Sequence, residues 1–140
     1  MIKTTTTSEI TEQRYRKLGG FLLLLVIGCL AYVVLYPVGA IGGIIMGIMP
    51  PMPLVMIVLM ALMEFIVLAL AFTILRRDRR YIYVYYAGIV DCLAACITQG
   101  IIGMVTPLMV VLAVVVTLVG SGLMIFYFLR SQRVSVYFAA

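Results

Sequence analysis

Apolar residues fill four long stretches of the chain, and short polar or turn-forming segments separate them. No charged side chain occurs between Leu18 and Met63. This run is too long for one membrane-spanning helix of about 20 residues. Pro37 and the Gly- and Pro-rich segment 38–53 interrupt it. The pattern therefore predicts one helix over about 18–36 and a second over about 54–75.

The second half of the chain predicts two further helices. The charged run Arg76–Arg80 ends the second helix and forms a very short turn, so the third helix covers about 81–102. The segment Gly103–Pro107 predicts a tight hairpin, because proline suits the first turn of a helix. The fourth helix covers about 108–129. A polar arm (1–17) and a short amphipathic tail (130–140) flank this four-span unit (18–129).

The amino-acid composition indicates the environment in which these helices lie. Hydrophobic residues make up 66% of the 140 residues, charged residues 11%, and the mean hydropathy is +1.26. Soluble domains contain about 45–50% apolar and about 25% charged residues. We therefore expect an all-α, integral membrane four-helix bundle with short antiparallel connections. The first apolar run is expected to be retained, since the apolar core of a signal peptide usually spans about 7–15 residues.

The uncharged segment 38–53 leaves two interpretations open. It either dips into the bilayer as a re-entrant loop, where protein must cover its backbone, or the first helix continues irregularly and the segment rests on the outer headgroups. Apolar connections of this kind require no ligand, so we prefer the second interpretation.

All ten Lys and Arg residues lie in three segments: the arm, which contains Lys3, the 76–80 turn and the tail. In a four-span topology these segments share one side, and basic segments remain cytoplasmic. Both termini are therefore expected in the cytoplasm, with the arm as a frayed tail rather than a surface helix. The basic side suits anionic lipid headgroups, although setting the topology is the preferred role. The candidate lipid contacts are Arg76, Arg77, Arg79, Arg80, Arg130 and Arg133.

Two acids interrupt the apolar spans. Glu64 lies about 18 Å from Arg76 along the second helix, and Asp91 about 17 Å from Arg80 along the third. The 76–80 turn makes these helices antiparallel neighbours, so both acids are expected near the bilayer midplane. A charged Asp there costs about 2.5–3.5 kcal/mol, and the neutral or proton-sharing state is the cheapest.

Two roles are open for these acids. The preferred one is interhelical bonding of the type Asp91–Gln99–Glu64, which would only hold the helices together. The alternative is a proton or cation site, because ionisable groups in membranes often serve function.

The sequence contains few residues that could support catalysis or metal binding. Histidine is absent, so no Ser–His or Cys–His nucleophile pair can form within it. Phosphate-cradling and zinc-protease motifs are absent too. Cys29, Cys92 and Cys96 lie in apolar segments, where thiols act as small packing groups. We expect no enzyme activity, no metal site, no cofactor and no nucleic-acid partner.

Two stretches carry a resemblance to a known family. One begins with Lys17 and reads KLGGFLL; the other reads YFLRSQRV from Tyr127 and is followed by Phe138. Together with length and span number, they resemble the bacterial family of small four-helix membrane proteins catalogued as domain of unknown function 2569. The family favours Trp where Phe21 stands. The resemblance implies a multi-pass protein of the bacterial inner membrane and supplies no catalytic residue.

The sequence thus favours a non-enzymatic membrane subunit or accessory protein that acts by helix packing against a membrane-protein partner or against itself. A small proton- or cation-coupled carrier that uses Glu64 and Asp91 is the alternative. An anionic-lipid-binding scaffold is the third hypothesis.

Overall fold

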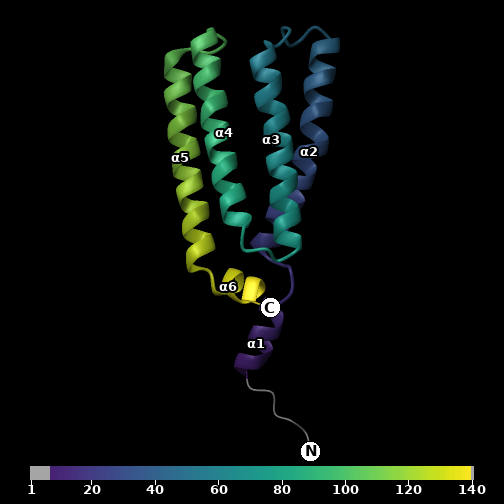
Figure 1. Cartoon of the computed structure of the whole chain (residues 1–140), viewed down its shortest axis with the longest axis vertical. Coiled ribbons are helices and arrows are strands. Elements are labelled where there is room, and N and C mark those ends of the chain that lie inside the picture. The colour runs from purple at the N-terminus through teal and green to yellow at the C-terminus, as the bar shows by residue number, and fades with distance from the viewer. Residues whose placement is uncertain (1–6, 140) are drawn as a thin grey trace, which may run out of the picture.

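The computed structural model describes residues 7–139, which form helices and no strand (Figure 1). Lys3 and the other residues of segment 1–6, together with Ala140, lie outside the described residues. The helices in chain order are α1 (Thr7–Tyr15), α2 (Phe21–Ile45), α3 (Leu54–Leu75), α4 (Tyr81–Ile102), α5 (Pro107–Arg130) and α6 (Gln132–Ala139). Four helical segments within residues 7–139 are long and apolar enough to cross a membrane.

The helices of the second half have the bounds that the turn-forming residues indicate. Helices α3 and α4 coincide with the predicted ranges 54–75 and 81–102. Gly103 ends α4 in the left-handed conformation, with φ 77°. Pro107 starts α5, and the Thr106 hydroxyl accepts a hydrogen bond from the Met109 amide (3.4 Å). A threonine cap followed by proline is a typical helix start.

The predicted end of the first long helix at Tyr36 is wrong. Helix α2 starts at Phe21 and continues through Pro37 to Ile45. Proline removes one backbone donor, but the following residues still bond within the helix, which is the only partner an apolar setting offers them. The segment 38–53 is thus a connection only over 46–53, where Gly47 turns the chain at φ 69°. Figure 1 places this connection at the end of α2 and α3, as the continuing-helix interpretation requires.

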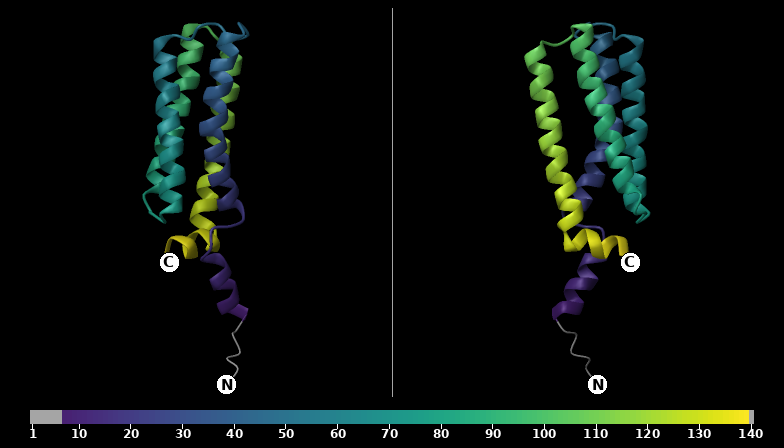
Figure 2. Two further views of the ribbon diagram at one scale, coloured as in Figure 1. Left: turned by 90° about the vertical axis from the view of Figure 1, so that its right-hand side faces the viewer. Right: turned by 60° about the vertical axis from the view of Figure 1, so that its left-hand side comes forward.

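The long helices pack as sequential neighbours: α2 on α3, α3 on α4, and α4 on α5. Helices α2 and α5 meet at one end, where the rings of Phe21 and Tyr127 lie 5.0 Å apart, and diverge toward the other end (Figures 1 and 2). The expected four-helix bundle is therefore splayed rather than evenly closed. Both described chain ends and the 76–80 turn lie at the end where α2 and α5 meet.

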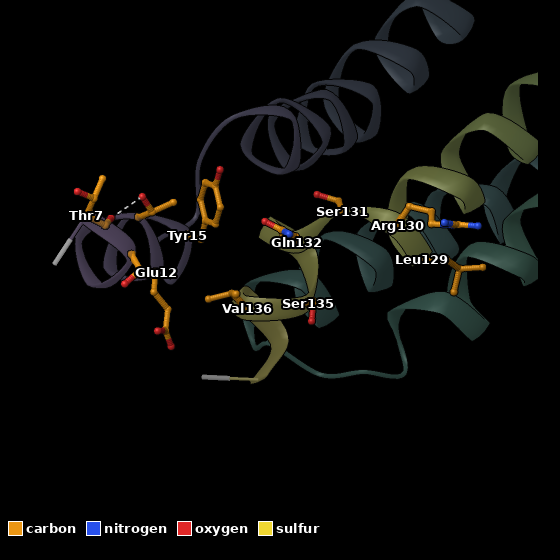
Figure 3. A pocket seen from close by; sticks show the side chains of 11 residues that line it. Thr7, Glu12, Tyr15, Leu129, Arg130, Ser131, Gln132, Ser135 and Val136 are labelled. Carbon is orange, nitrogen blue, oxygen red and sulfur yellow. Dashed lines mark hydrogen bonds between the residues drawn. The ribbon is translucent and has the colours of Figure 1, made fainter.

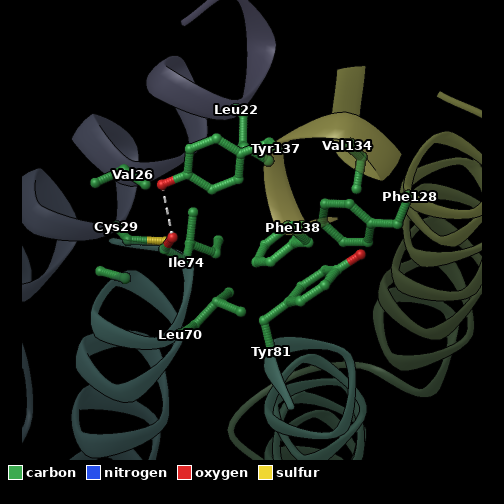
Figure 4. Close-up of a cluster of buried hydrophobic side chains, with 11 residues drawn as sticks. Leu22, Val26, Cys29, Leu70, Ile74, Tyr81, Phe128, Val134, Tyr137 and Phe138 are labelled. Carbon is green, nitrogen blue, oxygen red and sulfur yellow. Dashed lines mark hydrogen bonds between the residues drawn. The ribbon is translucent and has the colours of Figure 1, made fainter. Parts of the chain in front are cut away.

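The apolar core lies at that same end and depends on α6. Tyr137 and Phe138 are buried there, although the sequence suggested only a tail (Figure 4). The Tyr137 hydroxyl donates a hydrogen bond to the carbonyl of Ile74 near the end of α3 (2.8 Å), which also accepts a hydrogen bond from the Arg77 amide (3.1 Å). The Phe138 ring stacks on Tyr81, with centroids 4.2 Å apart. Helix α6 therefore closes the end of the four long helices.

The N-terminal arm is not a frayed tail over its described part. Residues 7–15 form α1, which buries none of its side chains and contacts α6. Between α1 and α2, the Arg133 guanidinium lies against Gly19 and Gly20, so that a Cβ on Gly19 would meet Nη2 at 3.2 Å. The KLGGFLL and YFLRSQRV stretches thus meet in space.

Candidate functional site

Glu64 and Asp91 each lie near the middle of a 22-residue helix, on α3 and α4. These two helices are antiparallel and packed together, so the acids occupy the same level of the molecule. This juxtaposition was predicted from the short 76–80 turn. The candidate functional site therefore lies at the middle of the helices, far from the basic end.

Both carboxyl groups are shielded and unpartnered. Asp91 is only 5% exposed and is the one buried polar or charged residue in the described range 7–139. Among these residues, none of the four carboxyl oxygens of Glu64 and Asp91 has a hydrogen-bond partner. An ionised carboxylate in such a place costs several kcal/mol. A proton or a bound cation removes that cost, so the arrangement suits either one.

The other two long helices place polar groups at the same level. The Tyr32 phenol on α2 interacts electrostatically with both acids and with the Cys92 thiol. The Cys92 sulfur lies 3.8 Å from the Thr117 hydroxyl on α5. We call these five residues the mid-helix polar cluster: Tyr32, Glu64, Asp91, Cys92 and Thr117. All four long helices contribute to it.

Sequence reasoning missed Tyr32. Most tyrosines of the chain lie near helix ends, where they suit a membrane interface, but Tyr32 and Tyr36 lie well inside the first long helix. Their rings stack, with centroids 4.9 Å apart and planes 14° apart. Distance from the interface is the signal that could have identified them.

The interhelical bonding predicted between Asp91, Gln99 and Glu64 is absent. No hydrogen bond joins Gln99 to either acid in the part of the chain that the structure describes. The reason is geometric, because α4 packs against α3 and α5 at the same time. A Cβ on Gly88 of α4 would lie 3.3 Å from Ile66 of α3, whereas Cys92 of α4 faces α5. The acids therefore do not act as hydrogen-bonding links between helices.

A groove of about 400 Å³ opens beside Glu64, between α2 and α3. Glu64 is the only charged residue among the described residues that line this groove, which we call the Glu64 groove. Its wall includes Ala40, Ile41 and Ile44, which belong to the part of α2 that the sequence assigned to a loop. The groove exists because α2 continues past Pro37. The remaining lining residues are Tyr36, Pro37, Met52, Ile57, Met60 and Ala61.

The basic residues lie at the α6 end, and four of the six candidate lipid contacts lie over aromatic rings of the chain: Arg76 over Phe72, Arg77 over Tyr137, Arg130 over Phe126 and Arg133 over Tyr15. Arg77 donates to the carbonyl of Arg16 (2.8 Å) and lies over the Tyr137 ring (4.9 Å). Arg133 is half-buried and lies over the Tyr15 ring (5.4 Å). Arg76, Arg77, Arg79, Arg80 and Arg130 are exposed.

A second, larger groove of about 640 Å³ lies between α1 and α6 (Figure 3). Hydroxyl side chains such as Thr11, Ser131 and Ser135 line it together with Glu12 and Arg130. It lies at the exposed end of the molecule and shares no residue with the mid-helix polar cluster. Its mixed polar lining defines no particular ligand.

No family model, curated protein or solved structure matches the chain. The resemblance to the domain of unknown function 2569 family therefore stays an expectation. What the structure adds is contact between the two stretches that carry it, through Arg133 and Gly20 and through Tyr127 and Phe21.

Proposed function

We propose that the chain is a multi-pass membrane protein that acts as a small proton- or cation-coupled carrier, with Glu64 and Asp91 as its ion-binding groups. The four apolar helices support insertion. The basic segments at one end favour a topology with both termini in the cytoplasm. The family resemblance adds the bacterial inner membrane as the location. No enzyme activity is part of this proposal.

The observation that carries the proposal is that four carboxyl oxygens are buried without a partner among residues 7–139. A purely structural acid would be expected to bond across to a neighbouring helix. These acids instead keep their binding capacity free, at the level that a transported ion must pass. Polar groups on α4 and α5 lie at the same level, where the Cys92 sulfur is 3.8 Å from the Thr117 hydroxyl.

The test is ion movement in proteoliposomes that contain the purified chain. Under an imposed pH gradient, we expect the wild type to dissipate the gradient, as followed by an entrapped pH-sensitive dye. Glu64→Gln and Asp91→Asn keep side-chain size but remove the ionisable group, and each is expected to reduce the rate at least tenfold. Glu9→Gln is the matched control, because Glu9 is exposed on α1 and its loss should change nothing.

Stability measured on the same samples separates the two roles of the acids. Unfolding temperatures of the variants should stay within a few degrees of the wild type, since no hydrogen bond is lost. Variants that move ions normally would contradict the proposal. So would variants that fail only because they no longer fold.

A membrane subunit or accessory protein is the second candidate. The observation that favours it is the surface of α5, which buries only Phe128 along its 24 residues. Such a helix has a free face for a second copy or a partner helix. Copurification of a stoichiometric membrane partner together with normal ion movement in Glu64→Gln would favour this function instead. The exposed arginines support a lipid-binding scaffold only as a third possibility.

A further inference from the structure

The Glu64 groove combines three features that bear on what it could bind. Its wall is almost entirely apolar, its volume of about 400 Å³ lies in the range of about 300–1,000 Å³ typical of small-molecule sites, and it contains one acid. The Glu64 carboxyl oxygens have no partner among the described residues. The groove therefore has one carboxyl group without a partner at an otherwise apolar wall.

The groove opens toward the outside of the helix layer. Its rim residues Ile41, Ile44 and Ile57 are 59%, 43% and 50% exposed, although they also line the groove. In a protein that spans a membrane, this surface faces lipid tails. A small hydrated ion does not arrive by that route, because it would have to leave water first. An occupant that partitions into lipid and carries a positive charge can reach it.

Aromatic side chains strengthen the match to a cation. Tyr36 lines the groove, and its ring stacks on Tyr32. The face of an aromatic ring attracts a cation within about 6 Å, and more strongly when the pair is shielded from water. A phenol wall, one carboxylate and apolar sides together fit a bulky organic cation better than a neutral lipid chain, which would leave the acid unpaired.

We infer that the Glu64 groove binds a lipophilic monovalent organic cation in exchange for a proton. The cation pairs with the Glu64 carboxylate, its apolar groups contact Ala40, Ala61 and Met60, and the proton held by Glu64 leaves to water. Charge balances, because one positive charge enters as one leaves. This inference rests on the proposed ion-coupled function and names its substrate class.

Tetraphenylphosphonium is a suitable probe, because it is lipophilic, singly charged and unable to donate a proton. Binding is measured by equilibrium dialysis with the purified full chain in detergent, and proton release is followed in the same solution with a pH indicator. We expect saturable binding with about one proton released per probe. Tetraphenylborate, an anion of the same shape, should not bind to the groove.

Variants of the groove separate this inference from the proposed function. Ala61→Phe fills the groove and is expected to weaken probe binding at least tenfold. Leu62→Phe is the control, since Leu62 is an exposed neighbour that does not line the groove. Glu64→Gln should abolish both probe binding and proton release. Ala40→Phe repeats the test from the α2 wall, in case Ala61→Phe fails to fold.

Four outcomes would overturn the inference. Equal binding of tetraphenylborate would make the groove a site for apolar groups in general, such as acyl chains. Unchanged binding in Ala61→Phe would place the probe elsewhere. A change of oligomeric state in Ala61→Phe would make the groove an interface between copies. Proton movement in the wild type with no probe binding would refute this inference and leave the proposed function standing.

Discussion

Replacing Gly20 by alanine perturbs the contact that joins the two ends of the chain. Gly20 precedes α2 with φ 60° and ψ −140°, a conformation that is essentially restricted to glycine. A Cβ at this position would also overlap Nη1 of Arg133. The substitution therefore strains the backbone and displaces the guanidinium at the same time, and α6, which carries Arg133, should detach.

Two terms set the size of the effect. The backbone conformation costs a non-glycine residue about 1–3 kcal/mol. Displacing Arg133 loses its contact with the Tyr15 ring, which is worth about 0.5–1 kcal/mol at an exposed site. The sum is about 1.5–4 kcal/mol, and each 1.4 kcal/mol corresponds to a tenfold change. We expect the detached population of α6 to rise by about 10- to 700-fold.

Amide hydrogen exchange over residues 132–139 measures this population, because the amides of α6 exchange when the helix detaches. Gly28→Ala is the control for an unstrained helical position, since nothing lies within 4 Å of its Cβ. Gly103→Ala is the control for backbone strain alone, because φ is 77° there and no neighbour is close. Neither control should change the exchange rate of α6.

A double variant tests the contact itself. If Arg133 causes the clash, Gly20→Ala should cost less in an Arg133→Ala background than in the wild type, because neighbouring sites are not additive. Equal costs in both backgrounds would refute the contact between the chain ends. Unchanged exchange in the single variant Gly20→Ala would refute the strained conformation as well.

Two further substitutions test helix packing. Tyr137→Phe removes the hydrogen bond to the Ile74 carbonyl (2.8 Å) and should lower the free energy of unfolding by about 0.5–1.5 kcal/mol. An unchanged denaturation midpoint would refute this prediction. Gly100→Ala places a Cβ 2.6 Å from Cγ2 of Val110, so overpacking between α4 and α5 should cost about 1–3 kcal/mol. Gly120→Ala is its control, because nothing lies within 4 Å there, and equal stability of the two variants would contradict the packing of α4 on α5.

The bounds of α3 and α4 could be predicted because strong local signals mark their ends. Arg76–Arg80 ends the apolar run, and Pro53 and Gly103 stand where no helix continues readily. The end of α2 could not be predicted in this way. Pro37 is also a strong local signal, yet its cost is outweighed when the following residues have no partner other than their own helix.

The matching positions of the two acids along their helices could be predicted from the short 76–80 turn, but the contacts around the acids could not. Whether Glu64 and Asp91 bond across helices depends on helix rotation, which a single sequence does not determine. The same holds for Tyr32, whose partners lie on two other helices. The packing of α6 could not be predicted from local sequence patterns either. Tyr137 and Phe138 become core residues only through contacts with Ile74 and Tyr81, which are distant in the sequence.

The distribution of packing along the helices bears on how a carrier of this design would work. Within the described chain, the apolar core gathers at the α6 end and includes neither Glu64 nor Asp91. In the other half, Met56 and Asp91 are the buried residues among those described. Regions with few buried contacts change conformation at the lowest cost. In the proposed carrier, the end closed by α6 would act as a fixed base, and the half that contains the acids and the Glu64 groove would be the part whose helix spacing responds to ion binding.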